Sequence, residues 1–176
     1  MKRWLLTLAA IVALAALSLT SPLAAADRAG KMPLRILTIV EGNLLFSGTA
    51  SGKFTLELSA SSDAGKLTLK YTYGSVFRTG AGLTFRPGER TDTFRGKYGT
   101  LVIHSIGRRF LVGVVNPKDP HGEDEVWMGT WSIVSGTGRY AGLKGGGEVA
   151  GIIEYAGHGT PSSYYLHRYE GFVTRS

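Results

Sequence analysis

The chain has 176 residues, no cysteine and a formal net charge of +7, from 20 basic and 13 acidic residues. The absence of cysteine excludes a disulfide framework, a lipid-modified cysteine and a thiol nucleophile. The basic residues are scattered along the chain rather than gathered on one element, which argues against nucleic-acid binding and favours a solvated, mildly cationic surface.

The first 26 residues have the pattern of an export signal. Lys2 and Arg3 form a positive start, residues 4–19 are apolar, and small residues lead to a cleavage point after Ala26. The apolar run is shorter than the roughly 20 residues of a membrane-spanning helix, and an uncleaved anchor is the alternative. We therefore expect a signal peptide over residues 1–26 and one domain over residues 27–176. The domain is expected to be exported to the periplasm or the medium, with no transmembrane anchor after cleavage.

The rest of the chain alternates apolar and polar residues with period two, in short runs bounded by turn-forming residues. This alternation is typical of strands with one dry face and one wet face. The predicted strands are 34–40, 44–49, 53–58, 66–73, 91–97, 101–106, 110–115, 126–134, 149–155 and 164–173. Residues 107–109 are expected to form a hairpin turn between two of these strands. Residues 116–124, which contain two prolines, are expected to form a loop.

Eight to ten short strands in one domain predict either a barrel or a sandwich. Glycines recur inside the strands, as the bends of a closed barrel require, and closure leaves no exposed sheet edge. We therefore predict an all-β fold, a single antiparallel β-barrel with eight strands.

The sequence "GTGRYAGLKGGG" at 136–147 contains the dinucleotide fingerprint G-x-G-x-x-G. That fingerprint binds a pyrophosphate only where a strand leads into a helix. A helix starting near Arg139 would contain Gly142 and three further glycines, each costing about 1 kcal/mol relative to alanine. We therefore interpret the run as a turn, in which Tyr140, Ala141 and Leu143 plug one end of the core.

Two segments resemble a known superfamily. The segment "GTWSIVSGTGRYAGLKGGGEVAG" (129–151) resembles the late-strand motif of the allene oxide cyclase and dirigent barrel proteins. The segment "TDTFRGKYGTLVIHS" (91–105) is similar to one found in exported bacterial proteins with that barrel. The resemblance implies an eight-stranded antiparallel barrel with an apolar interior. Plant members of the superfamily cyclise an allene oxide or orient phenolic radical coupling, and they form dimers or trimers, so the resemblance leaves self-association open here.

The last predicted strand carries the residues best suited to proton transfer. Tyr165, His167 and Tyr169 share one of its faces, and the alternation alone leaves open whether that face points inward. The candidate catalytic residues are His104, Tyr165 and His167, since these side chains can transfer protons to an apolar substrate. The favoured alternative is structural: the tyrosines seal a barrel end while Arg168 and Glu170 pair on the surface.

Four aromatic residues are expected to line the interior of the barrel. These candidate ligand-lining residues are Tyr71, Tyr73, Trp127 and Trp131. Residues His121, Glu123 and Asp124 contain metal-ligating groups, but a solvated turn is favoured there, so we predict no metal site and no cofactor.

The sequence therefore favours an exported, non-enzymatic β-barrel whose interior is either packed or binds a small apolar ligand. One alternative is a cyclase or isomerase acting on an apolar substrate in that interior. The other is an envelope-associated structural or adhesion protein that uses its positive outer surface.

Overall fold

The computed structural model describes residues 30–42, 47–116, 119–155 and 163–176. Within these ranges, the side chains of residues 42, 112–116, 119–124, 153–155 and 163 are not described. The chain divides into Met1–Gly30 and Lys31–Ser176, and the second unit is described below. The export signal expected over residues 1–26 lies outside the described residues. No helix in the described part of the chain is long and apolar enough to cross a bilayer.

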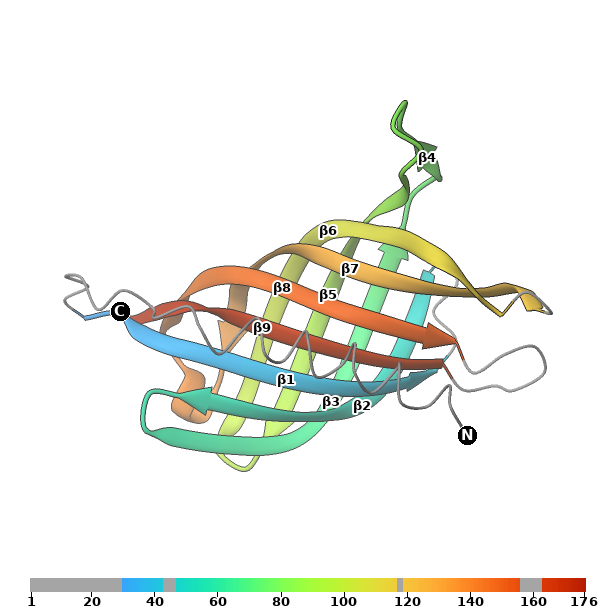
Figure 1. The fold of residues 1–176 in the computed structure, drawn as a ribbon. Helices are drawn as coiled ribbons and strands as arrows, with labels where there is room; N and C mark the ends of the chain where they lie inside the picture. Colours follow the sequence, from blue (N-terminus) through green and yellow to red (C-terminus); the bar gives the residue numbers. More distant parts are fainter. Residues whose placement is uncertain (1–29, 43–46, 117–118, 156–162) are drawn as a thin grey trace. The chain divides into compact units, whose positions relative to one another are not determined.

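The described part of Lys31–Ser176 consists almost entirely of β-strands (Figure 1). The elements in chain order are β1 (Met32–Gly42), β2 (Ser47–Leu58), β3 (Ser61–Tyr73), β4 (Phe77–Arg78), β5 (Thr84–Gly96), β6 (Gly99–Asn116), β7 (Asp119–Gly136), the 3-10 helix η1 (Gly138–Tyr140), β8 (Leu143–Tyr155) and β9 (Ser163–Arg175).

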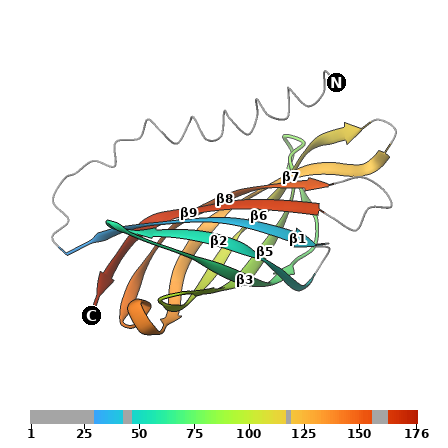
Figure 2. The same ribbon diagram turned by 90° about the horizontal axis from the view of Figure 1, so that it is seen from below.

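Eight of these strands form a closed antiparallel barrel, as predicted. The hydrogen-bonded order is β3-β2-β1-β9-β8-β7-β6-β5, and the pairing of β3 with β5 closes the ring. The short strand β4 pairs only with β5 and, with the turn that follows it, extends away from the barrel (Figures 1 and 2).

The strands are strongly staggered around the ring. A circuit that leaves β5 at Phe85 and follows directly paired residues returns to β5 at Arg95, ten residues further along. This stagger tilts the strands and widens the barrel, whose interior at eight strands is filled by side chains or holds one small ligand.

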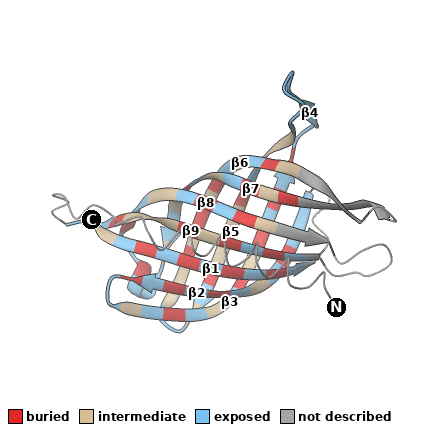
Figure 3. Ribbon diagram, viewed as in Figure 1, coloured by how far each residue is buried: buried red, intermediate tan, exposed pale blue. Residues whose placement is uncertain are grey.

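Period-two alternation decides which side chains enter the barrel. Phe54, Leu56 and Leu58 of β2 point inward and are buried, while the residues between them are exposed. Figure 3 shows the same alternation along the neighbouring strands. The core is therefore the inner lining of the ring, and its largest side chains are aromatic.

The expected hairpin at residues 107–109 is wrong, because β6 runs unbroken from Gly99 to Asn116. Gly107 lies inside the sheet between Gly88 and Gly129. A Cβ at Gly107 would lie 2.9 Å from Cζ2 of Trp127, so this glycine makes room for an indole ring rather than a turn. The runs 44–49 and 53–58 likewise belong to one strand, β2, in its described part.

The expected loop at residues 116–124 is also wrong, because β7 already begins at Asp119. Among the described residues, the part of β7 before Glu125 pairs with β6. On its other edge the described residues form no ladder with this part of β7, and proline is tolerated at such an edge.

The glycine run at 136–147 is a turn, as interpreted. Its helical part is the three-residue η1, and Gly138 and Gly142 have φ of +58° and +71°. Tyr140 and Leu143 are buried at the end of the core, whereas Ala141 is exposed and does not plug it. Tyr140 Oη donates to Asp63 Oδ2 at 2.6 Å, which ties the turn to β3.

Candidate functional site

The barrel interior contains a group of buried ionisable side chains. Alternation along β5 places Arg90 and Asp92 on the inner face, with 1% and 0% of their surfaces exposed. His167 and Tyr169 point inward from β9, and Thr38 points inward from β1. We call these five residues the buried polar cluster.

Arg90 is the centre of this cluster. Its Nη1 lies 2.7 Å from Nε2 of His167, and its Nη2 donates to Tyr169 Oη at 2.5 Å. Nη2 also lies 3.4 Å from Asp92 Oδ2, and Tyr169 Oη donates to the same carboxylate oxygen at 2.5 Å. The guanidinium, the phenol and the carboxylate thus form a closed triangle of contacts in which both charges are buried.

The contacts of His167 define its protonation state. Arginine has no acceptor, so Nε2 of His167 accepts from Arg90 and the ring proton sits on Nδ1, which faces Thr38 Oγ1 at 3.4 Å. Burial and the positive charge of Arg90 lower the pKa of His167 well below 6.5. The imidazole is therefore neutral at neutral pH and serves as an acceptor for Arg90.

The other ionisable groups of the cluster respond to burial in different directions. Burial raises the pKa of Asp92, against the opposing effects of Arg90 and of the hydrogen bond from Tyr169. Burial also raises the pKa of Tyr169 well above 10, so its phenol keeps its proton. Burial lowers the pKa of Arg90, but Tyr169 and Asp92 raise it by more, so Arg90 stays charged.

A second buried ion pair lies beside the cluster. Arg109 Nε donates to Glu125 Oε2, and the Arg109 guanidinium lies 4.9 Å from the ring centre of Tyr73. Tyr73 in turn contacts Trp127 edge to face at 5.8 Å, and Arg90 lies 4.9 Å from the Trp127 ring. Two guanidinium groups therefore lie next to one pair of aromatic rings. A cation close to an aromatic ring is attracted to it electrostatically.

Several polar atoms of this region have no hydrogen-bond partner among the described residues. They are Arg90 Nε, Trp127 Nε1, Tyr73 Oη, Ser105 Oγ and Asp92 Oδ1. A buried polar atom left unpaired costs about 1–3 kcal/mol. Four of these five atoms can donate a hydrogen bond, so this part of the interior has an excess of donors over acceptors.

The second interior tryptophan provides a contrast. Trp131 Nε1 donates to the backbone oxygens of Glu148 and Glu170, at 2.9 and 3.2 Å. The two indoles point inward from the same strand, β7, yet only that of Trp127 lacks an acceptor among the described residues. The excess of donors is therefore local to the region around Arg90.

Most of the predicted site residues do face the interior. Tyr165 and His167 are buried beside Tyr169, which settles the face of β9 that points inward. All four residues predicted to line the interior are buried on inward faces: Tyr71, Tyr73, Trp127 and Trp131. Arg168 and Glu170 pair on the outer surface, as expected.

His104 does not belong to the site. Leu101, Ile103 and Ser105 point inward from β6, so His104 lies on the outer face, with its Nε2 3.6 Å from Glu89 Oε2. The flanking apolar residues Val102 and Ile106 are also on the outer face, and this is why the local sequence resembles a buried strand.

Sequence reasoning misses the charged members of the interior. The predicted strand covers residues 91–97 and leaves out Arg90, whereas β5 begins at Thr84. Sequence reasoning also places Arg109 in a turn that does not exist. The available signal is the alternation Arg90, Asp92, Phe94, which continues the apolar face of β5 two residues at a time.

The structure adds nothing to the metal hypothesis. The side chains of His121, Glu123 and Asp124 lie outside those described. In the part of the chain whose side chains are described, no group of metal-ligating residues is close enough together to hold an ion.

Searches against family models, curated proteins and solved structures found no match to this chain. The fold therefore defines its class, a closed eight-stranded antiparallel β-barrel. The resemblance to allene oxide cyclase and dirigent proteins remains a prediction from the two sequence segments.

Proposed function

We propose that the protein is a non-enzymatic binding barrel. Its ligand is a small molecule with an apolar body that can pack on aromatic rings. The head of this molecule, either a carboxylate or a carbonyl, accepts hydrogen bonds. The single observation that carries this proposal is the group of unpartnered buried donors around Arg90.

Two aromatic side chains of the interior support this proposal. Tyr73 and Trp127 offer ring faces and edges, and each also carries an unpaired donor. Ligand sites of this kind are mostly apolar and contain a few placed polar groups that fix orientation. An acceptor head would pair with the donors that the described residues leave unsatisfied, while the body packs on the rings.

Nuclear magnetic resonance of the indole N–H groups of Trp127 and Trp131 tests this proposal. The probes are 2-naphthoate and indole-3-acetate, with naphthalene as the headless control. We expect the Trp127 indole signal to shift with the carboxylates, because its N–H gains an acceptor, and the Trp131 signal to stay in place. A Trp127 signal that is unmoved by both carboxylates at millimolar concentration contradicts the proposal.

The variant Tyr73→Phe sharpens this test. It removes one unpartnered hydroxyl and keeps the ring, so the barrel should fold normally. It should bind the carboxylates about 10- to 100-fold more weakly, which corresponds to one hydrogen bond to a charged group. Tyr140→Phe, which removes a hydroxyl at the far end of the core, is the matched control and should leave binding unchanged.

A cyclase or isomerase is the second candidate, and the position of Asp92 favours it. Its Oδ1 has no partner among the described residues, burial raises its pKa, and Arg90 is positioned to stabilise an oxyanion. In this version Asp92 removes a proton from carbon next to a carbonyl, the electron pair moves to the oxygen, and the proton is returned. Deuterium exchange from solvent into 2-tetralone, lost in Asp92→Asn, supports it; absence of exchange above the solvent rate rejects it.

A further inference from the structure

A row of side chains on the outer surface of the barrel changes from apolar to cationic along its length. Six outward residues on six neighbouring strands lie directly opposite one another in the register. In strand order they are Ile152, Leu166, Ile39, Lys53, Lys66 and Arg95. We call this set the outer row. Because neighbouring strands are about 4.8 Å apart, each half of the row extends about 10 Å across the sheet.

The cationic half has no counter-charge within the described part of the chain. None of the ion pairs found there includes Lys53, Lys66 or Arg95. The nearby carboxylate of Glu57 is instead directed to Arg35, at 3.6 Å. Like charges directly opposite each other destabilise a sheet. The three cations therefore destabilise the isolated barrel, and a bound anion would relieve their mutual repulsion.

The apolar half is exposed to solvent. Ile39 and Leu166 have 54% and 38% of their surfaces exposed, and Leu37, the next outward residue of β1, has 49%. Charged or polar residues usually occupy such positions on the outside of a barrel in water. This half therefore provides apolar contact area directly beside the cations.

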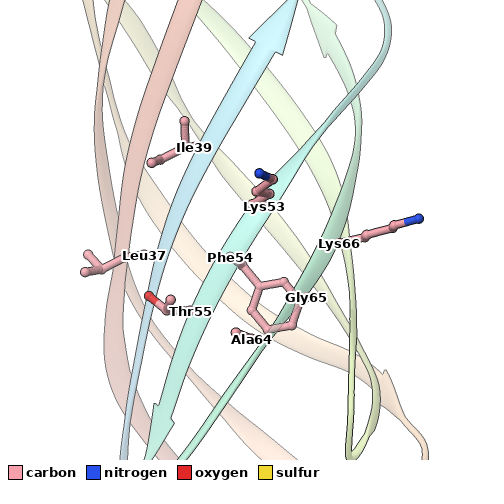
Figure 4. A pocket seen from close by; sticks show the side chains of 8 residues that line it. All are labelled: Leu37, Ile39, Lys53, Phe54, Thr55, Ala64, Gly65 and Lys66. Atoms are coloured by element: carbon pink, nitrogen blue, oxygen red, sulfur yellow. The ribbon is translucent and has the colours of Figure 1, made fainter.

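A groove joins the two halves. It lies on the outer face of β1, β2 and β3 and has a volume of about 710 Å³, within the range of small-molecule sites. Figure 4 shows Leu37 and Ile39 extending from β1 on one side of the groove and Lys66 extending from β3 on the other. Lys53 of β2 lies between them in the register.

We propose that this groove binds a single-chain anionic amphiphile, with its head at Lys53 and Lys66 and its chain on Ile39, Leu37 and Leu166. The charge pattern selects this occupant. A hydrophilic polyanion would leave the apolar half uncovered, and a neutral lipid would leave the cations unpaired. A second copy of this chain would place its own cations against cations or against apolar side chains.

Isothermal titration calorimetry with dodecyl phosphate, kept below its micelle concentration, tests the proposal on the full chain. Inorganic phosphate is the head-only control, and dodecyl maltoside is the neutral control with the same chain. We expect one dodecyl phosphate per barrel, with binding that weakens at 0.5 M salt, and at least tenfold weaker binding of both controls.

The double variant Lys53→Gln/Lys66→Gln should weaken dodecyl phosphate binding by about thirtyfold, because two lysines no longer face the anionic head. Lys70→Gln is the matched control, an exposed outward lysine on the same strand β3 but outside the row, and it should change binding less than twofold. Ile39→Ser tests the apolar half and should weaken the binding of both dodecyl compounds. All four substituted positions are on the solvent side, where changes rarely disturb folding.

Three outcomes overturn the proposal. They are equal binding to the wild type and the double variant, equal binding of phosphate and dodecyl phosphate, and a salt-sensitive dimer that the double variant abolishes. Tyr73→Phe, on the inside of the barrel, should leave dodecyl phosphate binding unchanged, so this proposal and the proposed interior function fail separately.

Discussion

Arg90 and His167 share one hydrogen bond of 2.7 Å inside the barrel, and the imidazole is the acceptor. This relationship requires an uncharged imidazole, because a proton on Nε2 would remove the acceptor and place a second positive charge against the guanidinium. Thr38 on the other side of the ring faces the protonated Nδ1. Within the buried polar cluster, the permanent cation Arg90 is thus surrounded by an imidazole and a phenol that stay neutral.

Stability should fall as the pH drops below about 6.5, through His167. Its pKa is lowered in the folded state, so between its ordinary value and the folded value only the unfolded chain binds the proton. The contribution of His167 to stability is fully present above its ordinary pKa of 6.5. It is lost towards lower pH, at up to about 1.4 kcal/mol per pH unit. Urea unfolding between pH 7.5 and 5 measures it.

The controls for this pH dependence are two histidine variants. His167→Gln should flatten the slope, because the group that takes up the proton on unfolding is gone. His104→Gln, on the outer surface beside Glu89, should leave the slope as in the wild type. A wild-type slope retained in the His167 variant would contradict the assignment of the neutral imidazole.

Two tyrosine variants should have opposite effects on stability. Tyr73→Phe removes an unpartnered buried hydroxyl, so the free energy of unfolding should stay constant or rise by about 1 kcal/mol. Tyr140→Phe removes the 2.6 Å bond to Asp63 and should lower it by about 1.5–3 kcal/mol, the value of a hydrogen bond to a charged group. Chemical unfolding of both variants in the same buffer measures the two changes. A larger loss of stability in Tyr73→Phe than in Tyr140→Phe would show that the Tyr73 hydroxyl is hydrogen-bonded.

The glycine opposite His167 should not tolerate a side chain. A Cβ on Gly151 would lie 2.1 Å from Cδ2 of His167 and 2.6 Å from the backbone oxygen of Leu166. Gly151→Ala should therefore lower the free energy of unfolding by about 1–3 kcal/mol, as overpacking does. Gly80 is the matched control, because a Cβ there would meet nothing within 4 Å, and Gly80→Ala should be close to neutral. Equal stability of the two variants would mean that β8 and β9 shift apart easily at this point.

The barrel and its aromatic lining follow directly from the sequence, since period-two alternation is a property of each strand by itself. Tyr165, His167 and Tyr169 share a face in any extended strand, and burial of that face confirms the grouping. Whether this face points into the barrel could be determined only from the closed ring. The pairing of β9 with β1 and β8 places Thr38 and Gly151 beside His167.

The charged centre could not be predicted in the same way. Arg90 and Asp92 look like solvent-side residues, and only the contacts from β9 at the opposite wall show that they are paired inside. Arg109 is hidden in the sequence because Gly107 is typical of a turn, whereas here it accommodates the ring of Trp127. Local sequence shows which residues share a face, but whether a charged face is buried depends on partners far away in the chain.

Asp63 and Asp92, both buried, should give acid responses of opposite sign. Burial raises the pKa of Asp63, but the bonds from Tyr140 and from the backbone N–H groups of Ala64, Tyr98 and Lys97 lower it by more, so its folded pKa lies below 3.8. Its stabilising contribution is present above 3.8 and is lost as the pH falls through the folded value. Asp92 has a raised folded pKa, so the folded state takes up its proton first and gains stability as the pH falls.

Acid titrations of unfolding between pH 5 and 2 test this pair. Asp63→Asn should flatten the loss of stability below pH 4 and lower the stability at pH 7, because a neutral amide is a weaker acceptor for four donors. Asp92→Asn should make the loss in acid steeper, because the opposing proton uptake is removed. Both variants delete one carboxylate and keep the side-chain shape, so the difference between them reports the environment of each group. The same dependence of stability on pH in both variants would show that the hydrogen bonds to Asp63 do not form in solution.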